Sequence, residues 1–284
     1  MEIIKDIDTL RIKIERLGKE SVGLIHTRGP LHEGHRTLIQ AARKENFLVI
    51  VSNIVIPREF ESIETYKRYP KESIQDKTLA SLAGADFFFA PDIQEFEAVE
   101  PMVGIKLKDC LKDELKGKDR PGYYEEYLST VIKLLNIVRP KKFYMSDKDL
   151  QKNYFTRLLL DQLYYNCELR ILPVVREEDG LSIDVKNQFL KADERKQVAE
   201  FYKIFVKAKT AYEKGMVSSR KIKWHIENEM SKLYLCQLEF AEIVEPTRLR
   251  KIETIIDEAI LMIGIKVGQV RICDYVRLTK GQES

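Results

Sequence analysis

The sequence predicts an α/β fold with a doubly wound parallel sheet, followed by a smaller α+β domain. Apolar runs typical of strands alternate with segments of helical periodicity over the first part of the chain. The run at residues 47–55 is almost continuously β-branched and apolar, as expected of a central parallel strand covered on both faces. Near residues 187–192 the pattern changes to charged amphipathic helices and short strand-like runs. We therefore expect one domain at residues 1–188 and a second at 189–284.

The elements of the first domain are expected in regular alternation. In chain order they are a helix at 7–17, a strand at 22–26, a helix at 36–44, a strand at 47–55, a helix at 73–83, a strand at 86–90, a helix at 127–138, a strand at 142–145, a helix at 150–165 and a strand at 167–175. Pro57 ends the second strand, and Gly84 caps the helix before the third. Ligands of such a sheet are expected at the carboxyl ends of its strands.

The second domain is expected to combine two helices with a small sheet. The helices are predicted at 194–213 and 218–233, and the strands at 238–244, 259–265 and 269–275. In the first domain, before the helix at 127–138, residues 116–122 form a basic loop rich in glycine and lysine. This loop is either ordinary solvated surface or a lid beside a phosphate site.

Composition excludes several classes of protein. The chain has 284 residues, of which 44% are hydrophobic and 33% charged, enough for a large buried core. A net charge of +3 gives no case for a general nucleic-acid binder. The four cysteines form no Cys-x-x-Cys pair and are interpreted as reduced thiols. The amino terminus has no signal-peptide pattern and no run is long enough to span a bilayer, so we expect a cytoplasmic protein.

The segment at residues 21–35 is the strongest functional signal. An apolar strand breaks at Gly29-Pro30, and a helix follows from about Glu33. The amino end of such a helix presents free N–H groups and a favourable dipole to an anion. Gly34 lets a ligand approach the backbone, and His32 and His35 can bond phosphate oxygens. A zinc helix would need histidines four residues apart rather than three, although two core histidines remain an alternative.

His-x-Gly-His after a first strand resembles the signature of the adenylate-forming nucleotidyltransferases, whose sheet is Rossmann-like. Over its whole length the chain is similar to the pantothenate synthetase (pantoate–β-alanine ligase) family. The segments that carry this resemblance occur in the family's order and are residues 29–35, 69–71, 120–121, 130–134, 148–151, 173–181, 187–190 and 241–246.

The resemblance implies a two-step, ATP-dependent amide ligase. A carboxylate attacks the α-phosphate of ATP to give an acyl adenylate and pyrophosphate, and an amine then displaces AMP. Negative charge grows on the phosphates as pyrophosphate leaves, so cations and N–H donors there stabilise the transition state. The catalytic residues implied are His32, His35, Lys148 and Lys186, assisted by Mg²⁺. The family also implies a homodimer, with small-molecule acid and amine substrates and no nucleic-acid or membrane partner.

Further site residues follow from position within the matched motifs. Those implied to bind the nucleotide are Thr27, Gly34, Asp149, Val175 and Asp184. Those implied to bind the substrates are Glu59, Lys152, Arg58, Tyr69 and Glu126, and Asp76 is implied to lie near the metal. Asp149 could equally cap the helix that follows it, and an exposed lysine such as Lys148 is often only solvated surface. Lys186 replaces the family's arginine, keeping the charge without the bidentate fork.

The sequence departs from the family where the acid should bind. Two family glutamines, implied to hold the hydroxyls and carboxylate of pantoate, are Glu59 and Lys152 here. These charges either pair with each other or bind a substrate of opposite charges, such as an amino acid, because idle buried charges are too costly. Asp184-Val185 replaces two serines that contact the triphosphate, and Glu125-Glu126 could receive an amine or simply begin a helix.

These departures lead to a main expectation and three alternatives. We expect an AMP-forming amide ligase with an altered acid pocket. The first alternative is a genuine pantothenate synthetase that condenses pantoate with β-alanine. A non-catalytic nucleotide-binding relative is a further alternative, favoured by Asp184-Val185 and opposed by His32, His35 and Lys148. A nucleotidyltransferase that stops at the adenylate is disfavoured by the matching carboxyl-terminal domain.

Overall fold

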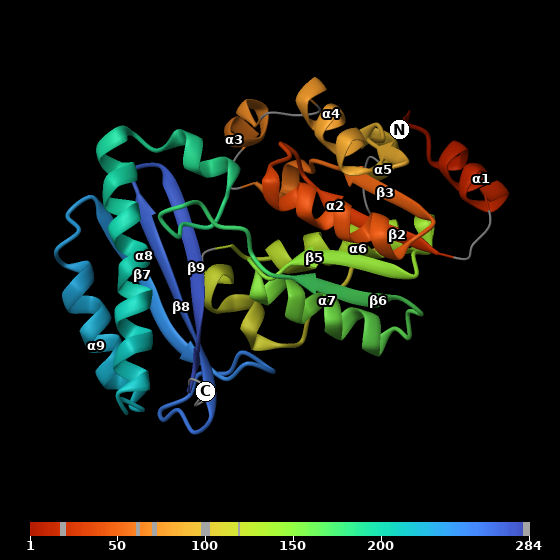
Figure 1. Ribbon diagram of the computed structural model, residues 1–284. Helices are drawn as coiled ribbons and strands as arrows, with labels where there is room; N and C mark the ends of the chain where they lie inside the picture. Colours follow the sequence, from red (N-terminus) through yellow and green to blue (C-terminus); the bar gives the residue numbers. More distant parts are fainter. Residues whose placement is uncertain (18–20, 61–62, 70–72, 98–102, 119, 281–284) are drawn as a thin grey trace. The chain divides into compact units, whose positions relative to one another are not determined.

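The computed structural model describes residues 1–17, 21–60, 63–69, 73–97, 103–118 and 120–280 (Figure 1). The chain divides into two compact units, Met1–Lys112 with Arg120–Val174, and Asp113–Asp119 with Val175–Ser284. The boundary predicted between residues 188 and 189 falls inside the second unit. The motif residues Pro70 and Lys71 and the loop residue Asp119 lie outside the described residues.

The first unit contains a six-stranded sheet in which every neighbouring pair is parallel. Its strands are β1 (Glu2–Ile4), β2 (Val22–Thr27), β3 (Leu48–Asn53), β4 (Phe87–Phe89), β5 (Lys142–Ser146) and β6 (Glu168–Leu172). The strand order β1-β4-β3-β2-β5-β6 reverses direction between β2 and β5. The predicted parallel α/β fold is confirmed. A reversal of strand order opens a crevice at the carboxyl ends of the two strands, where α/β proteins bind ligands.

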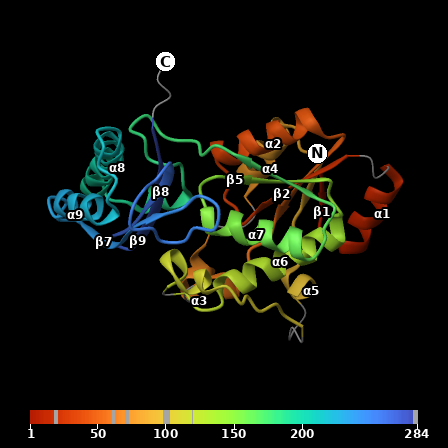
Figure 2. The ribbon, with the colours of Figure 1, turned by 90° about the horizontal axis from the view of Figure 1, so that it is seen from below.

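Helices cover both faces of this sheet (Figure 2). They are α1 (Ile7–Leu17), α2 (Glu33–Glu45), α3 (Ile63–Arg68), α4 (Ile74–Ala83), α5 (Ile93–Glu97), α6 (Tyr123–Val138) and α7 (Leu150–Gln162), with short 3-10 turns η1 (Pro57–Glu59), η2 (Cys110–Asp113) and η3 (Leu115–Gly117). In Figure 2, α2 and α4 lie on one side of the sheet, and α6 and α7 on the other. Two covered faces explain why β3 is buried at all six positions, as its apolar run predicts.

The core on the α2–α4 face is fully closed. Ile25 of β2, Val49 and Val51 of β3 and Phe88 of β4 are all 0% exposed. Alternate residues of parallel strands point to the same face, so these side chains meet the apolar stripes of α2 and α4. This packing fixes where β2 and β3 end, and therefore where the residues that follow them lie.

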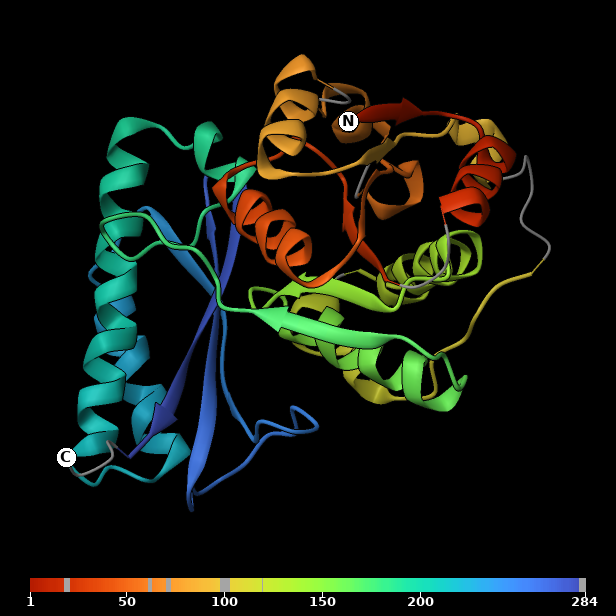
Figure 3. The same ribbon diagram turned by 45° about the vertical axis from the view of Figure 1, so that its right-hand side comes forward.

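The second unit has a three-stranded antiparallel sheet in the order β7-β8-β9. Its elements are η4 (Val185–Phe189), α8 (Ala192–Glu213), α9 (Ser219–Met230), β7 (Cys236–Val244), β8 (Glu258–Val267) and β9 (Val270–Thr279). Figure 3 shows α8 lying along these strands, and Phe201 and Phe205 of α8 are fully buried with Leu261 and Ile263 of β8. The predicted α+β arrangement is confirmed. Within the described ranges, every helix is too short or too polar to be a membrane span.

Helices α3 and α5 were not expected from the sequence, and β1 and α6 also differ from the prediction. Strand β1 was not expected, because three residues are too few to show a period, and it forms by pairing Ile3 with Phe88 of distant β4. Helix α6 begins at Tyr123 rather than residue 127, after Gly122 turns the chain at φ +77°. Glu125 and Glu126 therefore lie in its first helical turn, where acidic residues suit the helix dipole.

Candidate active site

Two imidazoles build the amino end of α2. His32 is the N-cap in extended conformation, and its Nδ1 accepts a hydrogen bond from Gly34 N at 3.2 Å. In return, His35 Nδ1 accepts from His32 N, also at 3.2 Å. The two rings lie with centroids 4.1 Å apart. This is a capping box made by histidines instead of the usual serine and glutamate.

The capping bonds determine which ring nitrogens face outward as donors. Because Nδ1 accepts in both neutral rings, Nε2 carries the proton in each. His32 and His35 therefore bring two N–H donors to a helix amino terminus, where the dipole already favours negative charge. The arrangement is suited to a phosphate group, as the sequence predicts.

Gly34 is required by the position of the His32 ring. A Cβ on residue 34 would lie 3.0 Å from His32 Cε1 and 3.1 Å from its Nδ1, closer than nearly all real contacts. Any side chain would displace the ring from its cap. The described part of the chain contains no group of three His, Cys, Asp or Glu residues that could hold a metal ion, so the geometry gives the zinc alternative no support.

Asp76 fixes the loop between β2 and α2. It is 2% exposed, and its Oδ1 accepts from Leu31 N at 2.6 Å while its Oδ2 accepts from Ser73 N at 3.2 Å. Tyr69 donates its hydroxyl to Gly29 O in the same loop. Asp76 Oδ1 thus holds the loop that leads to His32, and Oδ2 completes the capping box at the start of α4. Its role near a metal stays a prediction.

A second group of charged side chains lies where β2 ends and η1 follows β3. Glu59, on η1, is 1% exposed, and its Oε2 accepts from Arg28 Nη1 at 3.0 Å. Arg120 Nη2 donates to the backbone oxygen of Glu59 at 2.8 Å, and its guanidinium lies 3.7 Å from the Tyr123 ring centroid. Arg28 thus bonds the carboxylate of Glu59, and Arg120 bonds its backbone carbonyl group.

Lys152 joins this group from the first turn of α7. It is 9% exposed, and its Nζ lies 4.0 Å from the Tyr127 ring centroid and 5.1 Å from that of Tyr123. Aromatic faces attract an ammonium and partly replace the water it has lost. We call Arg28, Glu59, Lys152, Tyr123 and Tyr127 the acid-side cluster.

The cluster sets the charge states of its members. Burial raises the pKa of Glu59, but Arg28 and then Lys152 outweigh it, so the pKa lies below its usual range and the carboxylate is ionised. His26, near the carboxyl end of β2, interacts with the same charges. Burial lowers the pKa of His26 to about 4, so its ring is neutral near pH 7.

The two interpretations of Glu59 and Lys152 can now be compared with the geometry. The ion-pair partner of Glu59 is Arg28, and Lys152 lies against Tyr127. The predicted closing pair between Glu59 and Lys152 is therefore not what the structure contains, although the two charges interact. Sequence reasoning assigned no role to Arg28 or His26. Their signal was polar residues at the end of an otherwise apolar buried strand.

Some of the other site residues predicted in the first unit lie at the carboxyl ends of strands, and others lie on η1 and α6. Lys148 and Asp149 follow β5 at the reversal of strand order, and Asp149 also caps α7 by accepting from Lys152 N at 3.3 Å. Thr27 is buried and donates its hydroxyl to Ser52 O, which ties the end of β2 to β3. Arg58, by contrast, is exposed on η1, on the side away from the buried Glu59. Glu126 is half-buried in the first turn of α6.

Three predicted residues belong to the second unit. Val175 O accepts from Ile183 N at 3.0 Å, which closes the charged turn that follows β6. Asp184 caps η4 by accepting from Lys186 N at 2.9 Å. Lys186 itself is exposed. Their roles toward a nucleotide stay predictions.

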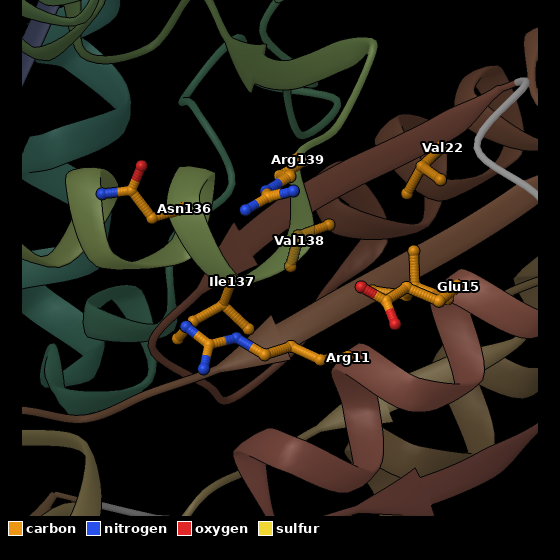
Figure 4. A pocket seen from close by; sticks show the side chains of 8 residues that line it. Arg11, Glu15, Val22, Asn136, Ile137, Val138 and Arg139 are labelled. Atoms are coloured by element: carbon orange, nitrogen blue, oxygen red, sulfur yellow. The ribbon is translucent and has the colours of Figure 1, made fainter.

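A small cavity of 60 Å³ lies elsewhere in the first unit (Figure 4). It is lined by Arg11 and Glu15 of α1, by Val22 at the first position of β2 and by Arg139 at the end of α6. Val22 is at the amino end of β2, opposite to the end that carries His26 and Arg28. The cavity is therefore separate from the candidate active site.

Comparison with known proteins shows what this chain resembles. The sequence model described as pantoate-beta-alanine ligase matches residues 2–277. The pantothenate synthetase of Thermosipho melanesiensis is 34% identical over 281 residues, covering 97% of this chain and 99% of that protein. The crystal structure of pantothenate synthetase from Thermus thermophilus superposes with a TM-score of 0.92 at 27% identity, covering 98% of this chain and 100% of that one. The pantoate-beta-alanine ligase of Francisella tularensis, solved with beta-gamma ATP and β-alanine, has the same fold, with a TM-score of 0.80 at 24% identity over 97% of both chains.

Proposed function

Because the chain belongs to the pantoate–β-alanine ligase family and is a carbon–nitrogen ligase, we propose that it uses ATP to condense pantoate with β-alanine. The single observation that carries this proposal is the histidine capping box, which supplies two N–H donors at the amino end of α2. The family model spans residues 2–277 and the similar proteins are pantothenate synthetases, which supports pantoate over an altered acid as the substrate.

In the first step a carboxylate oxygen of pantoate attacks the α-phosphorus of ATP. A phosphorus–oxygen bond to the acid forms, and the bond to the leaving pyrophosphate breaks with its electron pair. His32 and His35 donate from Nε2 to the phosphate oxygens on which charge grows, and Lys148 adds a positive charge after β5. Lys186 of the second unit is the further cation proposed for this step.

In the second step the amine of β-alanine attacks the acyl carbon of the adenylate. A carbon–nitrogen bond forms, the bond to AMP breaks, and the amine loses a proton. The phosphate donors of the first step also stabilise the departing AMP, because its charge develops at the same α-phosphate. The first unit thus needs to hold the acid and the nucleotide in line.

Mg²⁺ is proposed to enter with ATP rather than to occupy a protein cage. It commonly uses one or two carboxylates together with substrate phosphates. Within the described residues no three-ligand cluster exists, and both oxygens of Asp76 already accept backbone N–H groups. Asp76 is the carboxylate proposed nearest to the ion, which would neutralise charge on the triphosphate when bound.

A second candidate function keeps the same reaction with a different acid. It is favoured by the charged Glu59 and Lys152, where the resemblance implies neutral glutamines. We also propose a cytoplasmic homodimer, in keeping with the four free cysteines and the family expectation.

Pyrophosphate release tests the proposal. We expect release with ATP, Mg²⁺, β-alanine and pantoate, and a fall of about 100-fold or more in His35→Ala, since it removes a donor to the developing charge. His225→Ala is the matched control, because His225 is exposed on α9 of the second unit. Release with another acid but not with pantoate would favour the second candidate. No release with any acid would overturn the ligase assignment.

A further inference from the structure

The second unit has a cavity of about 1020 Å³, lined by residues outside the candidate active site. The lining residues lie between positions 218 and 227 at the start of α9, at 242 and 243 on β7, and at 251–254 in the segment between β7 and β8. All of them belong to the same unit, so the cavity is a property of that unit alone. Its volume is at the upper end of the range for cavities that bind small molecules.

Helix α9 begins at this cavity without a side-chain cap. Its N-cap residue, Ser218, makes no capping hydrogen bond. Ser219 N donates to Glu253 O at 2.9 Å, but the backbone N–H groups of Arg220 and Lys221 have no acceptor among the residues that the structure describes. The first turn of this 12-residue helix thus offers two N–H donors at the positive end of its dipole.

The hydroxyl group of Ser219 is a third donor at the same helix end. Ser219 lines the cavity and is only 5% exposed, and its Oγ has no hydrogen-bond partner in the described ranges. Buried hydroxyl groups are normally bonded, and leaving one unpaired costs stability. An anion bound at this end of α9 would accept from donors that the rest of the protein leaves unpaired.

The charged side chains that line the cavity have one positive charge in excess. Lys223 Nζ lies 2.8 Å and Lys251 Nζ lies 3.5 Å from Glu242, so these two lysines more than neutralise that carboxylate. Within the described part of the chain, Arg220 and Lys221 pair with no carboxylate. The complete set of charged lining residues is Arg220, Lys221, Lys223, Lys251, Glu227, Glu242 and Glu253.

Trp224 gives the cavity an aromatic face. It lines the cavity, yet it is 62% exposed, which is unusual for so large a ring. Arg220 and Lys221 precede it by four and three residues, so the three side chains share one face of α9. Ser219 lies five residues before Trp224, a rise of about 7.5 Å along the helix, which is comparable to the separation of phosphate and base in a nucleotide.

We propose that this cavity binds a nucleoside phosphate, with the phosphate at the amino end of α9 and the base against Trp224. The phosphate accepts from the Ser219 hydroxyl and from the backbone N–H groups of Arg220 and Lys221. The Lys221 ammonium balances its charge, and the base stacks on the indole ring, a contact that tolerates any base. This site is additional to the nucleotide site proposed at His32 and His35, and it does not depend on the ligase activity.

The fluorescence of Trp224 reports on this cavity directly, because the chain has a single tryptophan. The whole protein is titrated with AMP, ribose 5-phosphate, adenosine and inorganic phosphate, without Mg²⁺ or an acid substrate, and calorimetry gives the same dissociation constants independently. We expect AMP to quench the fluorescence. AMP should also bind about tenfold more tightly than each of the other three probes, since each lacks either the base or the phosphate.

Substitutions with opposite expected effects test the phosphate contacts. Ser219→Ala and Lys221→Met should each raise the Kd for AMP by about 5- to 10-fold, because each removes a donor to a charged group. Both variants should fold, since neither side chain makes a hydrogen bond or an ion pair in the described part of the chain. Glu253→Gln should lower the Kd by about twofold, because it removes a like charge from the same helix end.

Two controls separate this site from others. Lys196→Met removes an exposed cation of α8 that is outside the cavity, and it should keep the wild-type Kd. His35→Ala alters the candidate active site, and the quench should persist in it.

Four outcomes would overturn the proposal. The first is a Kd unchanged by Ser219→Ala and Lys221→Met, and the second is a quench that His35→Ala abolishes, because the signal would then come from the first unit. Inorganic phosphate that binds as tightly as AMP would exclude the contact between base and Trp224. Neither quench nor heat with any probe would exclude a ligand of this chemistry. The pyrophosphate-release assay tests the proposed function separately, so the failure of one does not imply the failure of the other.

Discussion

Each unit of the protein buries an arginine–carboxylate pair, and the two pairs differ in how completely they are bonded. In the second unit, Asp274 accepts from Arg176 Nη1 at 2.7 Å on Oδ2, and from Arg176 Nη2 at 3.1 Å and Tyr275 N at 2.8 Å on Oδ1. Both of its oxygens are satisfied. In the first unit, Glu59 accepts from Arg28 on one oxygen, and the other oxygen has no hydrogen-bond partner in the part of the chain that the structure describes.

This difference separates a structural role from a binding role. Arg176 also donates to Gly180 O at 2.9 Å, so the Arg176–Asp274 pair ties the turn after β6 to strand β9. It needs nothing more to be stable. The Arg28–Glu59 pair is equally buried on its acidic side but stays incomplete, which is expected of a site that a ligand completes.

Arg176→Met should give the largest change in stability. It leaves the Asp274 side chain, 1% exposed, without its cation, and breaking such a pair costs about 3–5 kcal/mol. Urea unfolding followed by the fluorescence of Trp224 measures this, because the protein's single tryptophan lies on α9 of the same unit.

Arg220→Met is the matched control for this prediction. Arg220 is exposed on α9, so its replacement should change the free energy of unfolding by less than about 0.5 kcal/mol. If Arg176→Met were no more destabilising than Arg220→Met, the Arg176–Asp274 pair would not be a structural element, and the contrast with Glu59 would disappear.

Arg28→Met should produce a smaller effect, of about tenfold in KM, and one that depends on pH. Without Arg28, Glu59 keeps Lys152 and Arg120 as its cations and His26 as a neutral neighbour, so its pKa rises. As pH falls the carboxyl takes a proton and loses its acceptor, and KM for pantoate should rise about tenfold between pH 8 and pH 5.5. In the wild type the lowered pKa of Glu59 keeps this contribution constant over that range.

Arg28→Lys tests whether charge is the cause. It keeps a cation beside Glu59, so its KM should change with pH no more than that of the wild type. Initial rates across the pH range, with saturating ATP and β-alanine, give the comparison. Equal pH profiles for the Met and Lys variants would show that Arg28 does not control the charge state of Glu59.

The Arg176–Asp274 and Arg28–Glu59 pairs also show how much of the structure could be predicted from the sequence. Period and turn signals predicted the parallel sheet, the buried β3 and the turn that carries His32, Gly34 and His35, because these depend on residues close together in the chain. The acid-side cluster depends on contacts between segments about 30 residues apart or more, such as Arg28 with Glu59. A sequence without an alignment does not reveal that partner.

Arg58 and Glu59, which are neighbours in the chain, show the same limit of prediction from the sequence. The matched motif marked both Arg58 and Glu59 as substrate-binding residues. The 3-10 turn η1 buries Glu59 and exposes Arg58, so only one of them can belong to the cluster. The position of a short polar turn on the sheet decides which of its residues faces inward. A turn made of charged residues has no hydrophobic period from which this could be predicted.

The Glu45 carboxylate is a third case beside Asp274 and Glu59, and its replacement is predicted to have the smallest effect. This carboxylate at the end of α2 accepts from Arg170 at 2.7 Å, Lys142 at 3.0 Å and Tyr144 at 2.9 Å, yet its side chain is 26% exposed. Like Asp274 it is fully bonded, and it has no vacant acceptor to offer a ligand. Glu45→Gln should therefore reduce stability without changing KM for any substrate.

The pH dependence of this loss follows from the Glu45 carboxyl. The hydrogen bonds from Arg170 and then Lys142 hold its pKa at about 2, below the usual 4.5. A carboxyl with a lowered pKa stabilises the fold above its unfolded pKa and loses that contribution as pH falls toward its folded pKa. We expect Glu45→Gln to lower the free energy of unfolding by about 1–2 kcal/mol at pH 7, a value reduced by solvent screening. The difference from wild type should shrink steadily below about pH 4.5.

Urea unfolding followed by circular dichroism from pH 7 to pH 3, with Glu64→Gln as control, measures this difference. A loss that stayed constant down to pH 3 would mean that Glu45 stabilises the sheet by packing rather than by charge.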